Sequence, residues 1–447
     1  MQSFFELPPG LSQDIVAAIS AQKDEPAWMT TFRLQAFQHF MARPMPSWGP
    51  DLRALPLDDI YYYVRQLATT ERRWEDLPLS LQQTFDALGV PQAEQSLLAG
   101  VGAQFESELI YKNLKKEWAE QGVIFCDITQ ALREYPALVQ RYFATVVPAH
   151  DNKFAALNSA VWSGGSFVYV PAGVRIEQPL QAYFRLNRAR MGQFERTLII
   201  AEPGSFVHYV EGCSAPVYSE SSLHSAVVEI VALPGAQVRY TTIQNWSTNV
   251  YNLVTKRAVA HAGAVVEWID GNFGSAVTMK YPCIVLAGEG AQGVVISLAV
   301  ANNGQQQDAG AKIIHKAPRT RSIIQAKSLS STGGWSTYRG LVVVTPAAIG
   351  AVTSVNCDAL LLDSSGRADT YPSMKIAASP VTVRHEASVS RLNDLQLHYL
   401  MARGLTKEQA AALFVNGFID AFVSQLPMEY AIEINRLINF TMEGSVG

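Results

Sequence analysis

Five short segments of this sequence repeat one pattern, in which an apolar run, a tight turn around a glycine and a second apolar run follow one another. The segments read VYVPAGVRIE, IIAEPGSFVHYV, IVALPGAQVRYT, AVAHAGAVVEWI and VLAGEGAQGVVI. Their turn glycines are spaced 31, 31, 28 and 27 residues apart, at Gly173, Gly204, Gly235, Gly263 and Gly290. The pattern continues more faintly near residues 319 and 347. A fixed period of this size indicates stacked units that each bury one face against the next.

The residues around these turns are typical of strands. From about residue 155 the chain is rich in Val, Ile, Thr and Tyr, and glycine or proline interrupts the apolar runs every few residues. No helical pattern separates the units. We therefore predict a mainly β protein whose core, residues 155–387, is a β-helix or a similar β-solenoid. A β-sandwich with evenly spaced hairpins is the alternative, and the repeated recurrence of one corner favours the solenoid.

Residues 1–154 are expected to form a mostly helical region. Apolar residues recur at helical spacing over 26–43 and again over 127–144. Asp127 stands where an N-cap would begin the second of these helices. The segments between them are rich in proline and polar residues, so we expect loops with short helices there.

Residues 388–447 return to a helical pattern. A first helix is expected to end at Gly404, because glycine is common just after helix ends. Thr406 and Gln409 have the spacing of a capping box at the start of a second helix. Pro427 stands at the first position of a third. The predicted plan is therefore helices, solenoid, helices.

Composition and motifs argue against several classes of function. The net charge of −4 provides no positive surface for nucleic acid or an anionic membrane. We expect no secretory signal and no membrane span, because no apolar stretch has the required length and flanks. P-loop, HExxH and GxSxG motifs are missing. The four cysteines lie far apart, as reduced thiols in a cytoplasmic protein do, and we expect that location.

Two cysteines and a histidine–glutamate pair are the candidate reactive groups. Cys357 lies in the strand-like run VNCDALLLDSSG, and Cys213 follows a strand in EGCSAP. His385 and Glu386 are adjacent where the solenoid should end. Thiolate, imidazole and carboxylate suit iron and persulfide chemistry. A lone cysteine is more often a small buried hydrophobe, so the residues by themselves leave both interpretations open.

Five further residues are more polar or bulkier than a solenoid strand requires. Gln244 and Trp246 are two positions apart and so share a strand face. Arg185 and Asn187 have the same spacing, and Lys256 lies in a later apolar run. The ordinary interpretation places Trp246 in the core and the two cations in solvent. Spacing alone does not decide between this and a functional role.

Long motifs from about residue 100 to the end of the chain resemble one known family. They include EGCSAPVYSESSLHSAVVEI, QNWSTNVYNLVTKRA, QDAGAKIIHKAP, CDALLLD, HEASVSRL and LPMEYAIEINRLI. These segments closely resemble the SufB/SufD family of the Suf iron–sulfur cluster assembly system, and in particular its SufB-type scaffold subunits. The resemblance implies a right-handed parallel β-helix core flanked by helical regions.

The resemblance also implies partners and cargo. A nascent iron–sulfur cluster would be held transiently, with sulfur delivered as persulfide by a cysteine desulfurase and its sulfur carrier. The chain would be an assembly scaffold without a nucleotide-hydrolysing site of its own. A SufC-type ABC ATPase would supply the energy and dock on the C-terminal helices, and a SufD paralogue or a second copy would complete the complex. Reduced FAD accompanies the family's complex in some cases, but no flavin motif is present here.

Residue roles follow from the same resemblance. Cys357 matches the essential cluster-binding or sulfur-accepting thiol, and His385 and Glu386 match iron ligands. Cys213 matches the sulfur entry point. The residues that match a sulfur path between the two thiols are Gln244, Trp246, Lys256, Arg185 and Asn187.

The chain departs from the family pattern in two places. Some members carry a CxxCxxxC motif near the N-terminus, whereas this chain has no cysteine before Cys126. Some have an acidic residue before the histidine–glutamate pair, where this chain has Arg384. This removes a carboxylate ligand and is expected to place a cation close to the site.

Three alternatives stay open at this point. A SufD-like structural paralogue would share the fold but lack the cluster, and the presence of both Cys213 and Cys357 argues against it. A β-helix carbohydrate-processing enzyme would need carboxylates along one solenoid face, whereas these repeats present mainly Val, Tyr, Arg and Gln. The third alternative is an interaction scaffold with no cofactor.

Overall fold

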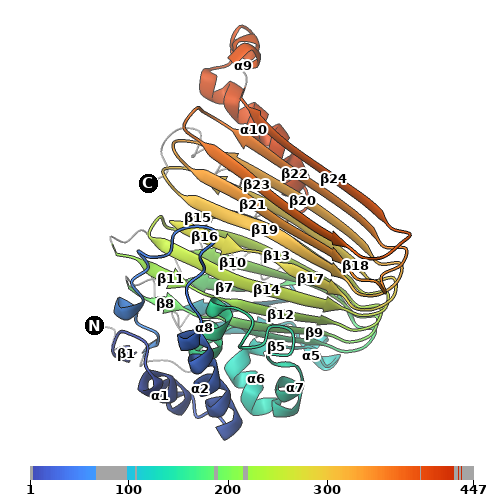
Figure 1. Cartoon of the computed structure of the whole chain (residues 1–447). Helices are drawn as coiled ribbons and strands as arrows, with labels where there is room; N and C mark the ends of the chain where they lie inside the picture. The colour runs from blue at the N-terminus through green and yellow to red at the C-terminus, as the bar shows by residue number, and fades with distance from the viewer. Residues whose placement is uncertain are drawn as a thin grey trace.

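The computed structural model describes residues 4–66, 98–105, 108–185, 190–214, 220–392 and 394–426, together with 431 and 434. Within them the chain coils repeatedly between two facing sheets (Figure 1), which confirms the predicted mainly β solenoid. From β6 onward, the chain passes from one sheet to the other within each coil, and in some coils the stretch on the second sheet is divided into two strands. Neighbours within a sheet are therefore one coil apart, and they pair in parallel from β6 onward.

The ten strands of the first sheet, sheet I, are β3 (Gly100–Phe105), β4 (Glu108–Leu114), β7 (Arg175–Arg185), β10 (Phe206–Ser214), β13 (Gln237–Trp246), β15 (Val265–Gly274), β18 (Gln292–Ala301), β20 (Arg321–Ser330), β22 (Val352–Leu361) and β24 (Thr382–Arg391). The twelve of sheet II are β5 (Ile124–Asp127), β6 (Ser166–Val170), β8 (Gly192–Gln193), β9 (Arg196–Ala201), β11 (Ser222–His224), β12 (Val227–Ala232), β14 (Val250–Ala260), β16 (Val277–Lys280), β17 (Cys283–Leu286), β19 (Gln306–His315), β21 (Trp335–Val344) and β23 (Arg367–Ile376). A separate pair joins β1 (Phe4–Glu6) to β2 (Val64–Gln66).

The glycine corner predicted from the repeat is present in the structure. All five turn glycines have φ between 64° and 73°, a left-handed conformation that glycine adopts without strain. The backbone N–H of each donates to a carbonyl of the next coil, as from Gly204 to Pro234 at 3.0 Å and from Gly263 to Glu289 at 2.8 Å. Arg319 and Gly350 occupy the same corner in later coils, with φ of 54° and 74°. The faint continuation of the repeat is therefore confirmed.

The space between the sheets is filled by stacked side chains, most of them apolar. One stack is aromatic, with ring centroids 5.0 Å apart between Tyr209 and Tyr240 and 5.0 Å apart between Tyr240 and Trp268. Valine, isoleucine and alanine side chains from both sheets complete this core. A parallel sheet can bury both of its faces only when other elements cover the outside, and helices do so here.

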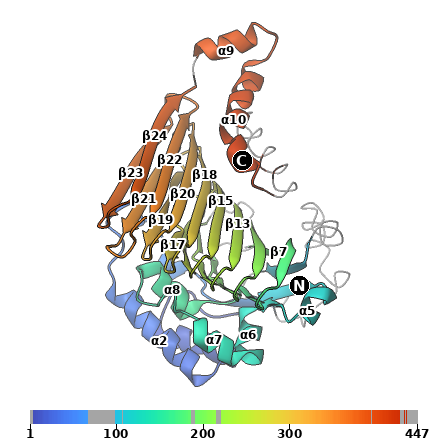
Figure 2. The same cartoon turned by 90° about the vertical axis from the view of Figure 1, so that its right-hand side faces the viewer.

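N-terminal helices cover the outer face of sheet II near the start of the solenoid (Figure 2). They are α1 (Gln13–Gln22), α2 (Ala27–Ala42), α6 (Ile128–Glu134), α7 (Pro136–Tyr142) and α8 (Lys153–Val161), with the shorter η1 (Leu57–Asp59) and α5 (Lys116–Glu120) nearby in the chain. A buried ion pair in sheet II helps to hold this N-terminal region in place. Arg196 on β9 contacts Glu229 on β12 at 2.6 Å. Glu229 also accepts hydrogen bonds from the backbone of Val146 and Val147, both at 2.9 Å.

Two details of the N-terminal region differ from expectation. The helix expected over 127–144 is broken into α6 and α7, because Pro136 cannot continue a helix but suits the first position of a new one. Asp127 caps α6 as predicted, accepting from the Thr129 N–H at 2.7 Å. The region also contributes β3 and β4 to sheet I and β5 to sheet II, which the helical pattern did not reveal.

The C-terminal region forms a helical hairpin of α9 (Asp394–Met401) and α10 (Lys407–Val423). The predicted capping box is confirmed by reciprocal hydrogen bonds between Thr406 and Gln409. Apolar residues of α10, Ile419 and Phe422 among them, pack on the outer face of sheet I, while α9 stands clear of the solenoid (Figure 2). The helix expected from Pro427 lies outside the described residues, apart from 431 and 434. In the part of the chain described, no helix has the length and apolarity needed to cross a bilayer.

Candidate functional site

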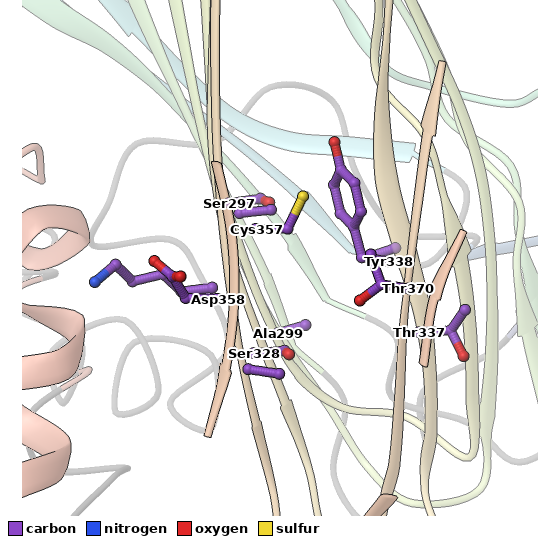
Figure 3. Close-up of a pocket in the computed structure, with 12 residues that line it drawn as sticks. Ser297, Ala299, Ser328, Thr337, Tyr338, Cys357, Asp358 and Thr370 are labelled. Carbon is purple, nitrogen blue, oxygen red and sulfur yellow. The ribbon is translucent and has the colours of Figure 1, made fainter. Parts of the chain in front are cut away.

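The thiol of Cys357 lies at the uncovered end of the solenoid. Its strand, β22, is the last but one of sheet I, and the side chain points between the sheets toward Tyr338 of β21 (Figure 3). It opens onto a small recess, partly open to solvent, whose lining combines small and polar residues. These residues are Ser297, Ala299, Ala309, Ala326, Lys327, Ser328, Thr337, Tyr338, Cys357, Asp358, Ala359 and Thr370.

The structure brings His385 to Cys357 but places Glu386 apart from them. The Cys357 Sγ and His385 Nε2 atoms are 3.8 Å apart. Side chains alternate along β24, so Glu386 and Arg384 lie on the face opposite to His385. The expected cation is therefore on the Glu386 face rather than beside the thiol. Among the described residues, no group of three His, Cys, Asp or Glu side chains is arranged to hold a metal.

The surroundings of Cys357 keep its thiol protonated. Burial raises the pKa of the thiol to about 11, although a hydrogen bond with Tyr338 acts in the opposite direction. The neighbouring carboxylate of Asp358 raises the pKa further. A thiol of this kind gives up its proton readily only when a metal or another electrophile binds the sulfur.

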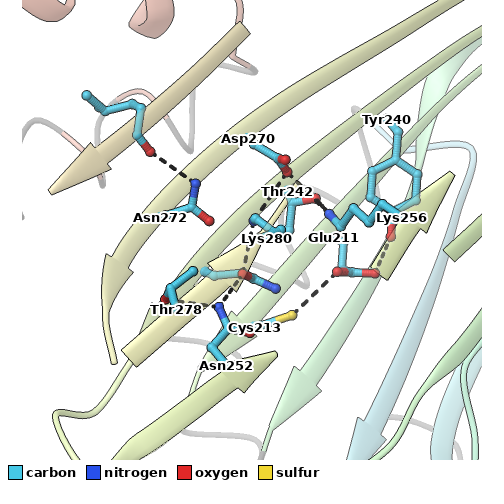
Figure 4. A network of polar contacts seen from close by, with 12 residues as sticks. Glu211, Cys213, Tyr240, Thr242, Asn252, Lys256, Asp270, Asn272, Thr278 and Lys280 are labelled. Atoms are coloured by element: carbon cyan, nitrogen blue, oxygen red, sulfur yellow. Dashed lines mark hydrogen bonds and ion pairs between the residues drawn. The ribbon is translucent and has the colours of Figure 1, made fainter. Parts of the chain in front are cut away.

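Cys213 lies deeper in the interior, on β10, next to a buried carboxylate. Its Sγ is 3.7 Å from Glu211 Oε1, and the Tyr240 hydroxyl donates to the other oxygen of Glu211 (Figure 4). Burial, together with the charge of Glu211, raises the pKa of Cys213 well above its ordinary value. Both interior thiols are therefore neutral at rest.

A buried cluster of charges adjoins Cys213. Lys256 and Lys280 approach the same oxygen of Asp270, with N–O distances of 3.2 and 3.3 Å (Figure 4). Burial lowers the pKa of Lys280 to about 8. Burial raises the pKa of Asp270, but the two ammonium groups outweigh this and hold it below its usual range. The ordinary interpretation of Lys256 as solvated surface is thus wrong, since its side chain is fully buried.

Gln244 and Trp246 share one strand face, as their spacing predicted, and the structure shows that this face points to the interior. Gln244 Oε1 accepts from Lys280 at 3.0 Å and from Asn252 at 2.9 Å. The Trp246 ring lies 4.6 Å from the ring of His224, whose Nε2 is 2.8 Å from the buried carboxylate of Glu195. These polar side chains form a continuous network inside the solenoid.

The remaining predicted path residues are described in part or not at all. Arg185 ends β7, where its backbone pairs with Ser214, the residue after Cys213. Asn187 lies outside the described residues. The structure therefore supports a shared location for Cys213, Gln244, Trp246 and Lys256, and leaves the other two untested.

Sequence reasoning missed Glu211, Asp270, Lys280 and Tyr338. A signal exists for Glu211 and Lys280, because each is a charged residue in a strand that otherwise has no charged side chain except a histidine, as in FVHYVEGCS and VTMK. Such a residue is buried at high cost unless it is paired. The pairing itself depends on which coils are neighbours, which the spacing of the repeat does not specify to the residue.

Fold and site together define a protein with a parallel β-solenoid core that holds two buried thiols in its interior. Two family models match the chain. One describes the SufBD core domain of SUF system FeS cluster assembly and covers residues 184–418, and the other describes the SufBD protein N-terminal region and covers residues 16–182. The chain belongs to the SufBD family of iron–sulfur cluster assembly proteins.

Relatives of nearly the same length share more than half of their residues with this chain. An iron–sulfur cluster assembly SufBD family protein of Staphylococcus epidermidis is 57% identical over 445 residues, which cover 100% of this chain and 96% of the relative. The iron–sulfur cluster assembly protein SufB of Bacillus subtilis is 54% identical over the same shares. The resemblance drawn from the motifs is confirmed, and the carbohydrate-processing alternative is disfavoured.

Proposed function

We propose that this chain is the subunit on which an iron–sulfur cluster is built, with sulfur entering at Cys213 and meeting iron at Cys357. The observation that carries the proposal is the pairing of Cys357 with His385 at the open end of the solenoid. A neutral thiol beside an imidazole offers two ligands for iron without a complete cage. A site of that kind suits a cluster that must later be released.

The buried network supports the sulfur half of the proposal. Persulfide is an anion at neutral pH, and a purely apolar core would exclude it. The interior beside Cys213 instead holds the ammonium groups of Lys256 and Lys280 and the amide of Gln244. A structural paralogue without a cluster would have no need of two interior thiols, one of them beside such a network.

We assign the open end of the solenoid to a second subunit of the same family, either a SufD paralogue or another copy of this chain. β24 leaves its ten side chains exposed, with Val383 and Val389 among them, and Tyr371 of β23 is exposed beside it. Partner strands that paired with β24 and with β23 would continue sheet I and sheet II, respectively. The second subunit would also bring its own ligands to complete the set begun by Cys357 and His385.

The α9–α10 hairpin is our candidate dock for the ABC-type ATPase that would drive assembly. Leu413 and Tyr399 are each 56% exposed on it, whereas Ile419 and Phe422 are buried against sheet I. The hairpin therefore offers a free apolar end and a fixed end. A cysteine desulfurase with a sulfur carrier would supply persulfide, and the four free thiols suit a reducing compartment such as the cytosol.

Replacement of Cys357 tests the function directly. After anaerobic reconstitution with iron and sulfide, Cys357→Ala should hold less than a tenth of the iron and acid-labile sulfide of the wild-type protein. Its melting temperature should change little, because one small buried side chain replaces another. Cys283→Ala is the matched control, since that buried thiol faces away from the interior and should leave cluster content unchanged. A full complement of iron and sulfide on Cys357→Ala would overturn the proposal.

A further inference from the structure

Cys213 and Cys357 are the two thiols inside the solenoid, and they are far apart. Five strand-to-strand steps of sheet I separate them, which amounts to about 24 Å. The other two cysteines of the chain lie outside the interior, with Cys126 in the cluster beneath α6 and α7 and Cys283 on the outer face of β17. Direct thiol exchange needs contact between sulfur atoms. Sulfur that passes between these thiols must therefore travel on a mobile carrier.

One inward row of sheet I connects the buried charges to the open end. Strand register places Asp270, Ser297, Ala326 and Cys357 one after another on this row. The two residues in the middle are small and both line the recess at Cys357. Small side chains at these positions leave room between the aspartate and the thiol.

Sheet II repeats this arrangement across the interior. Register places Lys280, Ala309 and Tyr338 one after another on an inward row. Ala309 and Tyr338 line the same recess. The recess thus ends one strand away from Lys280 on one sheet and one strand away from Asp270 on the other.

The charge cluster of Lys256, Lys280 and Asp270 lies one strand inward of the recess, and its groups could also bind an anion. Lys256 and Lys280 share a single carboxylate oxygen of Asp270. The amide nitrogen of Gln244 and the indole nitrogen of Trp246 are buried and have no hydrogen-bond acceptor within the described residues. Burial and, to a lesser extent, the neighbouring ammonium group of Lys256 lower the pKa of Lys280, and a nearby negative charge would offset both effects. An incoming anion would supply that charge and accept from the free donors.

We propose that Lys256, Lys280 and Asp270 form a binding site for hydrodisulfide, HSS⁻, which carries sulfane sulfur from Cys213 past this site and then through the recess to Cys357. The inference rests on the proposed function, in which sulfur enters at Cys213. The lysines hold the anion, and Asp270 keeps the two lysines together when the site is empty. Asp270 and Lys280 are thereby positioning residues for sulfur transfer.

The transfer balances with hydrosulfide as the one co-reactant. HS⁻ attacks the outer sulfur of the Cys213 persulfide, the bond between that sulfur and Cys213 breaks, and the proton passes to the departing thiolate. The products are the Cys213 thiol and HSS⁻. The Cys357 sulfur then attacks the outer sulfur of HSS⁻ while its thiol proton is given up. Cys357 persulfide forms and HS⁻ is regenerated, so no oxidant or reductant is consumed.

The test follows sulfur from [³⁵S]cysteine, delivered to the full-length protein by a cysteine desulfurase and its sulfur carrier, onto the two cysteines separately. In Lys280→Met, Cys213 should load as in the wild type while loading of Cys357 falls at least tenfold. Lys280→Arg should restore much of the loss. Lys312→Met is the matched control, because Lys312 lies on the outer face of sheet II, and it should load both cysteines normally. Normal loading of Cys357 in Lys280→Met would overturn the inference.

A second variant covers the case in which Lys280→Met does not fold. Ala309→Leu fills the recess without changing charge and should also stop sulfur at Cys213, and normal loading of Cys357 in it would count against the route.

In the wild type, added hydrosulfide should speed the loading of Cys357, and no response would exclude HSS⁻ as the carrier. Cys213→Ser tests the entry point of sulfur separately from the role of Lys280. If Cys357 loads normally in that variant, the proposed entry point is wrong, whatever Lys280 does.

Discussion

At the scale of single residues, His315 links the stability of the solenoid to pH. Its ring is fully buried between the sheets, where Nδ1 is 2.8 Å from the Thr320 hydroxyl and Nε2 is 3.0 Å from that of Ser322. Burial lowers the pKa of His315 to about 4. The unfolded chain binds the proton near pH 6.5, so the histidine's contribution is complete above that pH and is lost as the pH falls toward 4.

We predict that the wild-type protein loses about 2 kcal/mol of unfolding free energy between pH 7 and pH 5 through His315 alone. His315→Gln keeps two hydrogen-bonding atoms but cannot be protonated in this range, so its loss should be smaller by that amount. Urea midpoints at the two pH values measure the difference. His208, whose pKa burial also lowers to about 4, is present in both proteins and cancels in the comparison. Equal losses in the two proteins would contradict the prediction.

The reactive residues show what a sequence reveals at this scale. Gln244 and Trp246 could be placed on one strand face because alternation along a strand is a local rule. The ion pair of Lys280 could not be predicted, because its partners Asp270 and Gln244 come from other coils. The same limit applies to Glu386, which is adjacent to His385 in sequence and therefore points to the opposite face of the strand.

At the scale of elements, the glycine corners of the coils are the part of the repeat that is easiest to recognise in the sequence. Gly263 has a φ of 64°, and a β carbon built on it would meet no atom within 4 Å. Gly274 has a φ of 70°, but there a β carbon would collide with the backbone of Trp246. The first glycine is therefore required only by its backbone conformation, and the second also by close packing.

Gly263→Ala should lower the free energy of unfolding by about 1 kcal/mol, the cost of a left-handed alanine. Gly263→Asn should cost less, because asparagine tolerates this conformation better. Gly274→Ala should cost considerably more than either, because the backbone must move. Chemical denaturation of the three variants checks this order. A Gly263→Ala variant as unstable as Gly274→Ala would show that the corner is crowded.

The elements outside the repeat were harder to predict. The solenoid follows from a corner that recurs with nearly constant spacing, and each copy supports the others. β3 and β4 occur once, and the pairing of β3 with β7 spans a long stretch of chain. The division between α6 and α7 depends on whether Pro136 interrupts one helix or starts another, and helical periodicity is compatible with both.

At the scale of the whole molecule, the two ends of the solenoid differ. Helices α1, α2 and α6–α8 cover its beginning, whereas its last coil is uncovered and the α9–α10 hairpin projects beside it (Figure 1). The sequence pattern predicted the general order of helices, solenoid and helices. Which end stays open is decided by where the flanking helices pack, and the sequence pattern does not contain that information.

Leu413→Glu should abolish co-purification of the ATPase partner while leaving the circular dichroism spectrum of the isolated chain unchanged. The reason is that this exposed side chain lies on the free end of the hairpin and not against sheet I. Met41→Glu is the matched control, because Met41 is an equally exposed apolar residue of α2 at the other end of the molecule. Undiminished binding by Leu413→Glu would move the dock away from the hairpin, most plausibly to the N-terminal helices.

The uncovered last coil is expected to limit the abundance of this protein in a cell. β23 and β24 each leave a ten-residue edge with free backbone groups, and such edges are templates for aggregation when nothing pairs with them. A chain made in excess of its partner would carry two of them. We therefore expect its abundance to follow the supply of the partner, with the surplus removed by proteolysis or lost to inclusion bodies.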